Sequence, residues 1–201
     1  ERTATITITG TNDNPALTAG NIITSEDALE TGINVDAATS NLLNLATDID
    51  DVNSSLVVGT VNGAAGSVDN PVSVTLSYTD ADGAPQTQAV NLTVNANGSY
   101  SIVGFDLDEL PLGNNATASF NYQAKDDSNA LSTERTAIIT ITGTNDAAAV
   151  SSDSEVLVET NAALSSSGTL TSSDVDNPDN TFTPATINGT IGTFTIDATG
   201  A

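Results

Sequence analysis

The chain has 201 residues, with only 3 lysines and arginines against 26 aspartates and glutamates, and its formal net charge is −23. This charge excludes nucleic acids and anionic membrane surfaces as natural partners, and it favours metal cations. Because His, Cys, Met and Trp are absent, oxygen atoms are the metal ligands that remain, and these suit Ca²⁺ better than Mg²⁺ or the transition metals.

An internal repeat sets the organisation of the chain. Residues 1–13 read ERTATITITGTND and residues 134–146 read ERTAIITITGTND, so one position differs. In both copies a glutamate follows the final aspartate after 13 residues, and an Asp-x-Asp motif comes later. Such self-similarity is typical of tandem modules. We therefore expect residues 1–13 to be the last strand of one module, 14–146 a complete module, and 147–201 the start of a third within a longer array.

The expected elements are β-strands throughout. Apolar and polar residues alternate with a period of two near residues 6–8, 72–78, 90–94, 120–124 and 139–141. Asn-Gly or Asp-Gly turns follow at residues 62–63, 82–83, 97–98 and 188–189, and residues 106–110 predict one helical turn. This pattern predicts an all-β fold of antiparallel β-sandwich modules with Ig-like topology. The expected aromatic core consists of Tyr78, Tyr100, Phe105, Phe120 and Tyr122.

The stretch ITITGTNDNP at residues 6–15 resembles the closing strand and linker of VCBS and cadherin-like repeats. The second copy, with Glu159, the motif at 174–176 and GTFTID at 192–197, resembles the opening of such a repeat. These repeats occur in large, type I-secreted bacterial adhesins of the RTX kind. The resemblance implies an Ig-like or cadherin-like sandwich, calcium at the module junctions, and an extending role at the bacterial cell surface. The first copy departs from the pattern at 31–43, where extra residues lie.

A calcium site at the junctions can also be argued from the residues alone. The linker is short and rich in oxygen ligands, and a sandwich brings alternate loops to the same end, so distant acids can converge. We expect Glu26 and Asp50 to share one ion with the linker, which would clamp neighbouring modules together. The candidate ligands are Asn12, Asp13, Asn14, Glu26, Asp48, Asp50, Asp51, Asp126, Asp127, Asn145, Asp146, Glu159, Asp174 and Asp176.

Other interpretations remain open. Asn-Asp and Asp-x-Asp segments also form ordinary solvated turns, and we expect Asp80 and Asp82 to form a hairpin loop without metal. No catalytic triad can be assembled without histidine, so an enzyme is not expected. The favoured function is a calcium-stiffened extracellular spacer that holds distal adhesive domains near a cell-surface or glycan partner. The alternatives are a sandwich that itself binds a glycan or protein, and an accessory linker in a secreted hydrolase.

Overall fold

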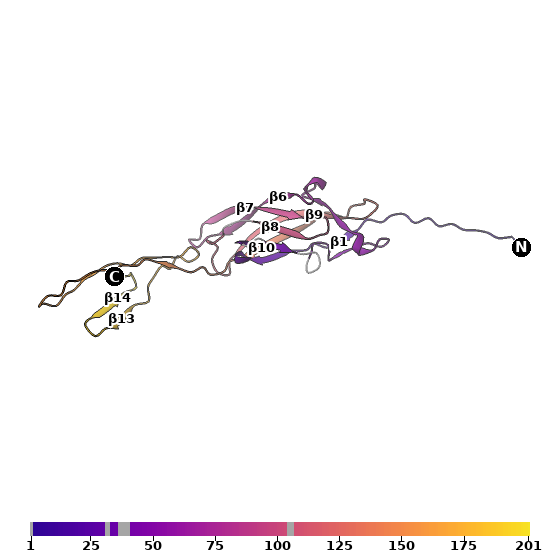
Figure 1. Ribbon diagram of the computed structural model, residues 1–201. Helices are drawn as coiled ribbons and strands as arrows, with labels where there is room; N and C mark the ends of the chain where they lie inside the picture. Colours follow the sequence, from indigo (N-terminus) through magenta and orange to yellow (C-terminus); the bar gives the residue numbers. More distant parts are fainter. Residues whose placement is uncertain (1, 31–32, 36–40, 104–106) are drawn as a thin grey trace.

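A computed structural model describes residues 2–30, 33–35, 41–103 and 107–201 (Figure 1). Strands predominate, as the sequence predicts, and the fold is all-β. The strands are β1 (Ala16–Leu17), β2 (Ile22–Ser25), β3 (Ile33–Val35), β4 (Ala46–Thr47), β5 (Val57–Val61), β6 (Pro71–Thr79), β7 (Pro85–Val94), β8 (Tyr100–Val103), β9 (Asn115–Lys125), β10 (Arg135–Thr142), β11 (Ala149–Val150), β12 (Ser172–Ser173), β13 (Ala185–Asn188) and β14 (Thr193–Ile196). The helical pieces are α1 (Glu26–Glu30) and the 3₁₀ turns Asn53–Ser55 and Ala65–Ser67. No helix in the described ranges has the length and apolar character needed to cross a membrane.

The main sheet has the strand order β2-β10-β9-β6-β7-β8-β3, and β5 also pairs with β9. Its neighbouring strands are antiparallel except for β2 and β10, which run parallel, with Ile22 opposite Ile139 and Ser25 opposite Thr142. The expectation of a wholly antiparallel fold is therefore wrong for this pair. The parallel pairing has a consequence for the site, because the residues that follow β2 lie beside those that follow β10.

The predicted alternation is confirmed in the main sheet. In β6 and β9 every second side chain is buried, while the Ser, Thr and Asn residues between them face outward. Tyr78, Tyr100, Phe120 and Tyr122 all lie in the core, and Phe105 lies outside the described residues. The Tyr122 hydroxyl donates a hydrogen bond to the Leu42 carbonyl (3.1 Å) and accepts one from the Gly20 N–H (2.8 Å), so this fully buried phenol is satisfied.

Hydrogen bonds to the Asp80 side chain close the hairpin loop between β6 and β7. Asp80 accepts hydrogen bonds from the Ala84 N–H (2.8 Å) and from Gln86 Nε2 (2.7 Å), and the Gln86 bond is the main reason why the Asp80 pKa is lowered. Gly83 supplies the positive φ of 82° that the turn requires. The loop joins β6 to β7 in antiparallel register, as expected.

Segment 106–110, expected as one helical turn, is in its described part a single turn, in which the Leu110 N–H donates to the Leu107 carbonyl (2.7 Å). Its buried leucines fix it to the core. The short helix α1 was not expected. Ser25 followed by two acids and then Ala-Leu-Glu is a recognisable helix start, which could have predicted it.

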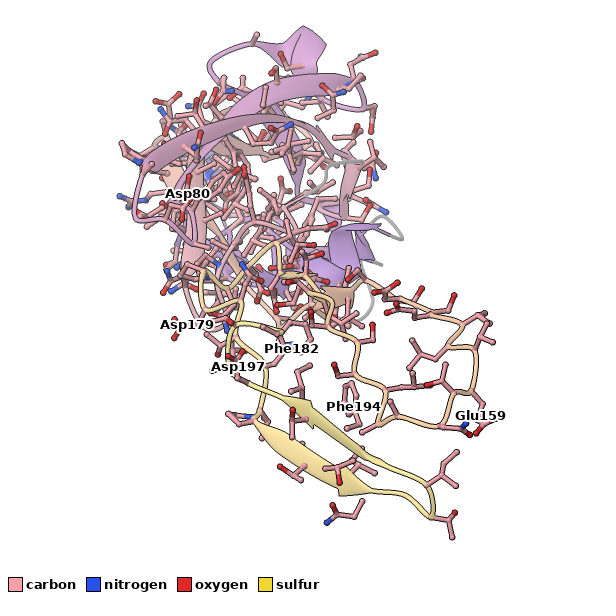
Figure 2. All side chains as sticks on the ribbon, turned by 90° about the vertical axis from the view of Figure 1, so that its left-hand side faces the viewer. Asp80, Glu159, Asp179, Phe182, Phe194 and Asp197 are labelled. Atoms are coloured by element: carbon pink, nitrogen blue, oxygen red, sulfur yellow. The ribbon has the colours of Figure 1, made fainter. Side chains whose placement is uncertain are left out.

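The segments on either side of the main sheet contribute nothing to the core. Residues 2–15 form no strand, and they leave the body at the end opposite to residues 147–201 (Figure 1). Among residues 147–201 only Asp176 and Gly200 are buried. Phe194, a residue of β14, is 54% exposed (Figure 2). The core therefore belongs to segment 14–146, and the module boundaries remain a prediction.

Limited proteolysis can test those boundaries. We expect cleavage after about residue 147 long before any cleavage within 14–146, because the downstream strands are short two-stranded pairs with exposed apolar side chains. Timed digestion followed by mass spectrometry of the fragments would check this. Equal protection of the two segments would contradict the division.

Candidate metal sites

Most of the predicted ligands gather in two groups at opposite ends of segment 14–146, and Asp27 and Asp108 join one of them. The N-terminal acidic cluster consists of Asn12, Asp13, Asp48, Asp50, Asp51, Asp126 and Asp127. The C-terminal acidic cluster consists of Glu26, Asp27, Asp108, Asn145, Asp146, Asp174 and Asp176. Each cluster combines a linker with loops that lie far away in the sequence.

Two hydrogen bonds hold the linker at the N-terminal acidic cluster. Asn12 Nδ2 donates to Asp126 Oδ2 (2.7 Å), and the Asp13 N–H donates to Asp50 Oδ2 (3.0 Å). Asp126 is buried, and its other carboxylate oxygen accepts the Ala130 N–H (2.7 Å), which closes the loop between β9 and β10. The linker is thereby joined to two separate loops of the module that follows it.

The loop at 48–51 buries one carboxylate oxygen of Asp48 and one of Asp51, while Asp50 is exposed. Asp48 Oδ1 accepts the N–H groups of Asp50 (3.1 Å) and Asp51 (3.2 Å), an arrangement typical of an Asx turn. Asp48 Oδ2 and Asp51 Oδ2 are buried and have no hydrogen-bond partner within the described part of the chain. The adjacent Asp48 carboxylate raises the pKa of Asp50, and desolvation followed by the nearby Asp127 raises that of Asp51. These acids repel one another unless a proton or a cation intervenes.

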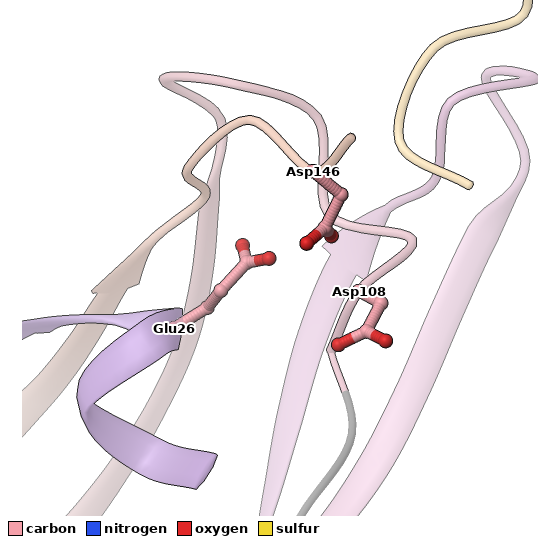
Figure 3. A group of neighbouring side chains, drawn as sticks. All are labelled: Glu26, Asp108 and Asp146. Carbon is pink, nitrogen blue, oxygen red and sulfur yellow. The ribbon is translucent and has the colours of Figure 1, made fainter. Parts of the chain in front are cut away.

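Three carboxylates of the C-terminal acidic cluster point toward one another (Figure 3). Glu26, Asp108 and Asp146 each offer one oxygen, and these oxygens all lie within 4.8 Å of one another, so together they could hold a metal ion. Glu26 begins α1 directly after β2, and the parallel register with β10 places it beside Thr144, whose N–H donates to Glu26 Oε2 (3.1 Å).

Asp108 reaches the cluster because its loop packs against the end of β10. The Gly113 N–H donates to the Gly143 carbonyl (3.0 Å), and the Gly143 N–H donates to the Asn114 carbonyl (2.9 Å). A Cβ at Gly143 would lie only 2.4 Å from the carbonyl oxygens of Leu110 and Pro111. This close backbone approach, which only glycine permits, brings the loop against the linker.

The pKa of Glu26 is shifted strongly upward. Its side chain is 3% exposed, and desolvation raises its pKa to about 7; the Thr144 bond acts in the opposite direction, and the charges of Asp146, Asp108 and Asp27 raise the pKa further. A carboxylate buried among other acids is unfavourable in its charged form. A bound cation would remove that penalty, because it replaces the repulsion by shared coordination.

The Asp-x-Asp motif that follows the linker completes the C-terminal acidic cluster. Asp176 is only 4% exposed, and its carboxylate lies beside the Asp146 backbone. Desolvation and the neighbouring Asp174 raise its pKa. Asp146 Oδ2, Asp174 Oδ1 and Asp176 Oδ1 are buried and lack a hydrogen-bond partner within the described residues. Buried oxygens of this kind are the ligands that a hard cation such as Ca²⁺ requires.

The linker lies beside an Asp-x-Asp motif at both ends. The Asp13 N–H donates to Asp50 (3.0 Å), and the Asp146 backbone lies beside the Asp176 carboxylate; these are equivalent positions of the sequence repeat. The preceding asparagine donates to the next backbone carbonyl in both copies, Asn12 to Asp13 and Asn145 to Asp146. The geometry is thus a property of the repeat and not of one loop.

The predicted grouping of Glu26 with Asp50 is wrong. Glu26 lies in the C-terminal acidic cluster, since β2 carries it in parallel with β10 to the end where the chain leaves the sheet, whereas Asp50 lies with Asp13 at the other end. Glu26 therefore lies beside the segment that follows β10 and not beside the segment that precedes β1. Glu159 is exposed and lies at the tip of a loop away from the sheet (Figure 2).

Asn14, another predicted ligand, is exposed, and Pro15 next to it is buried. Asp27 and Asp108 were missed by the sequence reasoning, although Asp27 accepts the Thr144 hydroxyl (2.8 Å) and Asp108 faces Glu26. No local pattern could have revealed Asp108, because its place depends on the contact between its loop and Gly143. No protein-family model and no curated protein sequence matches the chain.

The pKa of Glu26 predicts a pH dependence of stability in the absence of metal. Between pH 4.5 and about 7 the folded protein keeps a proton on Glu26 that the unfolded chain has lost, so this group lowers the stability as the pH rises through that window. In EDTA, Glu26→Gln should therefore gain stability relative to wild type between pH 5 and pH 8, by several degrees in melting temperature at roughly 2–4 °C per kcal/mol.

Melting curves of both proteins at the two pH values would measure this difference. Asp82→Asn is the matched control, because Asp82 lies in the Asp80 hairpin loop and outside both clusters. If the difference in melting temperature between Glu26→Gln and wild type is the same at pH 5 and pH 8, the pKa of Glu26 is not raised and this prediction is wrong.

Proposed function

We propose that the chain is a calcium-stiffened spacer from a bacterial surface adhesin of the kind that contains VCBS or cadherin-like repeats. In this proposal segment 14–146 is an Ig-like β-sandwich, and Ca²⁺ joins it to the modules before and after it. The protein works outside the cell, where calcium is abundant, and it extends distal adhesive domains toward their target without catalysing a reaction.

The observation that carries the proposal is the repeated contact between linker and Asp-x-Asp motif. A solvated turn would have no reason to bury its acids, yet Asp176 is 4% exposed and Glu26 is 3% exposed. At the C-terminal acidic cluster, carboxylates from before the linker and after the linker converge on it. One cation bound there would contact both sides and so fix two bodies relative to each other.

Calcium is the cation that fits the donors best. The cluster offers carboxylates and carbonyls, and the whole chain lacks nitrogen and sulfur ligands from His, Cys and Met. Ca²⁺ accepts 6–8 oxygen ligands in irregular geometry, whereas Mg²⁺ requires a near-ideal octahedron and keeps much of its water. The net charge of −23 destabilises the folded chain by repulsion among its acids, and no disulfide offsets this repulsion, so a bound cation would stabilise the fold.

The surface favours a spacer over a glycan-binding module. The described aromatic side chains of the main sheet are buried, so they offer no platform on which a sugar ring could stack. A hollow of about 460 Å³ beside β6 and β9 is lined by Ser77, Tyr78, Thr79, Asn114 and Asn115, and the Tyr78 ring is 8% exposed there. Near-identical repetition adds length, which is what a spacer needs.

Small-angle scattering tests the proposal directly. For an array of three copies of segment 14–146, we expect a rod in millimolar Ca²⁺ and a flexible string of folded modules in EDTA, because unneutralised acids at both sides of each linker repel within a Debye length of about 8 Å. Circular dichroism should show that β-structure is retained in both conditions. Equal flexibility with and without calcium would refute the stiffening mechanism and leave the binding-module alternative as the better one.

A further inference from the structure

The strands nearest the two ends of segment 14–146 are bonded to each other. β2 follows the first linker and β10 precedes the second, and the two strands pair in parallel from Ile22 opposite Ile139 to Ser25 opposite Thr142. Both strands run from the end that holds the N-terminal acidic cluster toward the end that holds the C-terminal one. The part of the chain that enters the sheet is thereby joined side by side to the part that leaves it.

Side chains extend this pairing upstream of β2. Asn21 Oδ1 accepts the Ile138 N–H (3.1 Å), so an amide side chain continues the pairing one position before Ile22. Further upstream, the Leu17 carbonyl accepts a hydrogen bond from Arg135 Nε (2.8 Å). These two bonds hold the approach to β2 against the start of β10.

Side chains extend the pairing downstream as well. Glu26 Oε2 accepts the Thr144 N–H (3.1 Å), and Asp27 Oδ1 accepts the Thr144 hydroxyl (2.8 Å). We call the whole contact, residues 17–27 against residues 135–144, the β2–β10 seam. At about 3.3 Å per residue, its bonds are spread over roughly 30 Å of chain.

The parallel direction of the two strands decides how the seam responds to tension. In a tandem array, a pull reaches the module through its two linkers, which leave the body at opposite ends (Figure 1). This pull slides β2 lengthwise along β10, so the strand bonds and the side-chain bonds at both ends of the seam carry the load together. If the two strands were antiparallel, the same pull would separate them from one end, one bond after another.

We propose that the β2–β10 seam is a mechanical clamp, which lets the module carry tension along the array without unfolding. The proposal rests on the proposed function for the source of the tension, and it does not depend on calcium. β2 is the strand that must yield first, because it lies at the edge of the main sheet, whereas β10 is also paired with β9 from Arg135 to Thr142. Buried Ile22, Ile139 and Ile141 shield the inner side of the seam from water, which would otherwise compete for its hydrogen bonds.

Single-molecule force spectroscopy of the whole chain in EDTA tests the clamp. The chain has no cysteine, so two introduced cysteines define the direction of the pull. Thr18→Cys with Ala147→Cys stretches the seam lengthwise, and Thr18→Cys with Thr133→Cys separates the adjacent starts of β2 and β10; these positions are all exposed. At the same pulling speed, we expect a several-fold higher unfolding force in the lengthwise direction, because all bonds of the seam resist at once. Equal forces in the two directions would overturn the proposal.

Substitutions at one asparagine show whether the seam carries the load. Asn21→Ala removes the acceptor of the Ile138 N–H and should lower the lengthwise unfolding force, whereas Asn21→Asp keeps an acceptor oxygen and should retain most of that force. Asn70→Ala is the matched control, because Asn70 donates to the Gly66 and Val68 carbonyls outside the seam. A loss of force no larger for Asn21→Ala than for Asn70→Ala would also overturn the proposal. Because EDTA is present throughout, the result does not depend on whether calcium stiffens the junctions, and the two proposals fail separately.

Discussion

Calcium is expected to raise the melting temperature of the chain by roughly 5–10 °C relative to EDTA at equal ionic strength. An ion that binds only the folded state stabilises it by about 2.7 kcal/mol at a hundredfold excess over Kd, and each kcal/mol corresponds to roughly 2–4 °C at this size. The physical source of the gain is the pair of acidic clusters, whose buried carboxylate oxygens lack partners in the described structure. Scanning calorimetry in millimolar CaCl₂ and in EDTA would measure it.

The control for this experiment separates coordination from screening. NaCl at matched ionic strength weakens repulsion among exposed acids without occupying a site. If NaCl reproduces the whole shift, the clusters are merely repulsive surfaces and the calcium proposal fails. Magnesium chloride is a second control, because it screens like calcium but suits an irregular oxygen site less well.

Paired substitutions should also show which carboxylates share one calcium ion. Glu26→Gln and Asp146→Asn affect one cluster, so their effects on calcium affinity should be strongly non-additive, whereas Glu26→Gln and Asp50→Asn affect different clusters and should be additive. Titration calorimetry of the single and double variants would show this. Coupling between Glu26 and Asp50 would contradict the arrangement of the structure.

Gly143→Ala is expected to destabilise the fold by about 1–3 kcal/mol, the usual cost of forcing an extra carbon into a tightly packed place. The new Cβ would meet two backbone carbonyl oxygens at 2.4 Å, and neither can move as a flexible side chain would. The paired hydrogen bonds between the Asn114 loop and Gly143 would be strained or lost. Because the same contact positions Asp108 beside the linker, the calcium response of the C-terminal acidic cluster should fall too.

The repeat itself provides the matched control for this substitution. Gly10→Ala makes the same chemical change at the equivalent position, where an added Cβ has nothing within 4 Å. It should leave the melting temperature within about 1 °C of wild type, in line with the small effect of most exposed substitutions. Equal losses for the two variants would show that the close contact at Gly143 is not the cause.

The sequence by itself determined the local structure and the chemistry available to it. Alternation of apolar and polar residues placed β6, β7, β9 and β10 correctly, since a period of two describes any strand with one buried face. The absence of His, Cys and Met limited metal ligands to oxygen. The internal repeat also marked both linkers and both Asp-x-Asp motifs, which the structure brings together in pairs.

Only the tertiary structure decided which acids share an end of the module. Sequence spacing suggested that Glu26 belongs with Asp50, but the parallel pairing of β2 with β10 carries Glu26 to the opposite end. Asp108 joins it because its loop packs on Gly143. Strand direction and loop packing depend on contacts between residues far apart in the sequence, as for Glu26 with Thr144 and for Leu110 with Gly143, and a local pattern cannot encode such contacts.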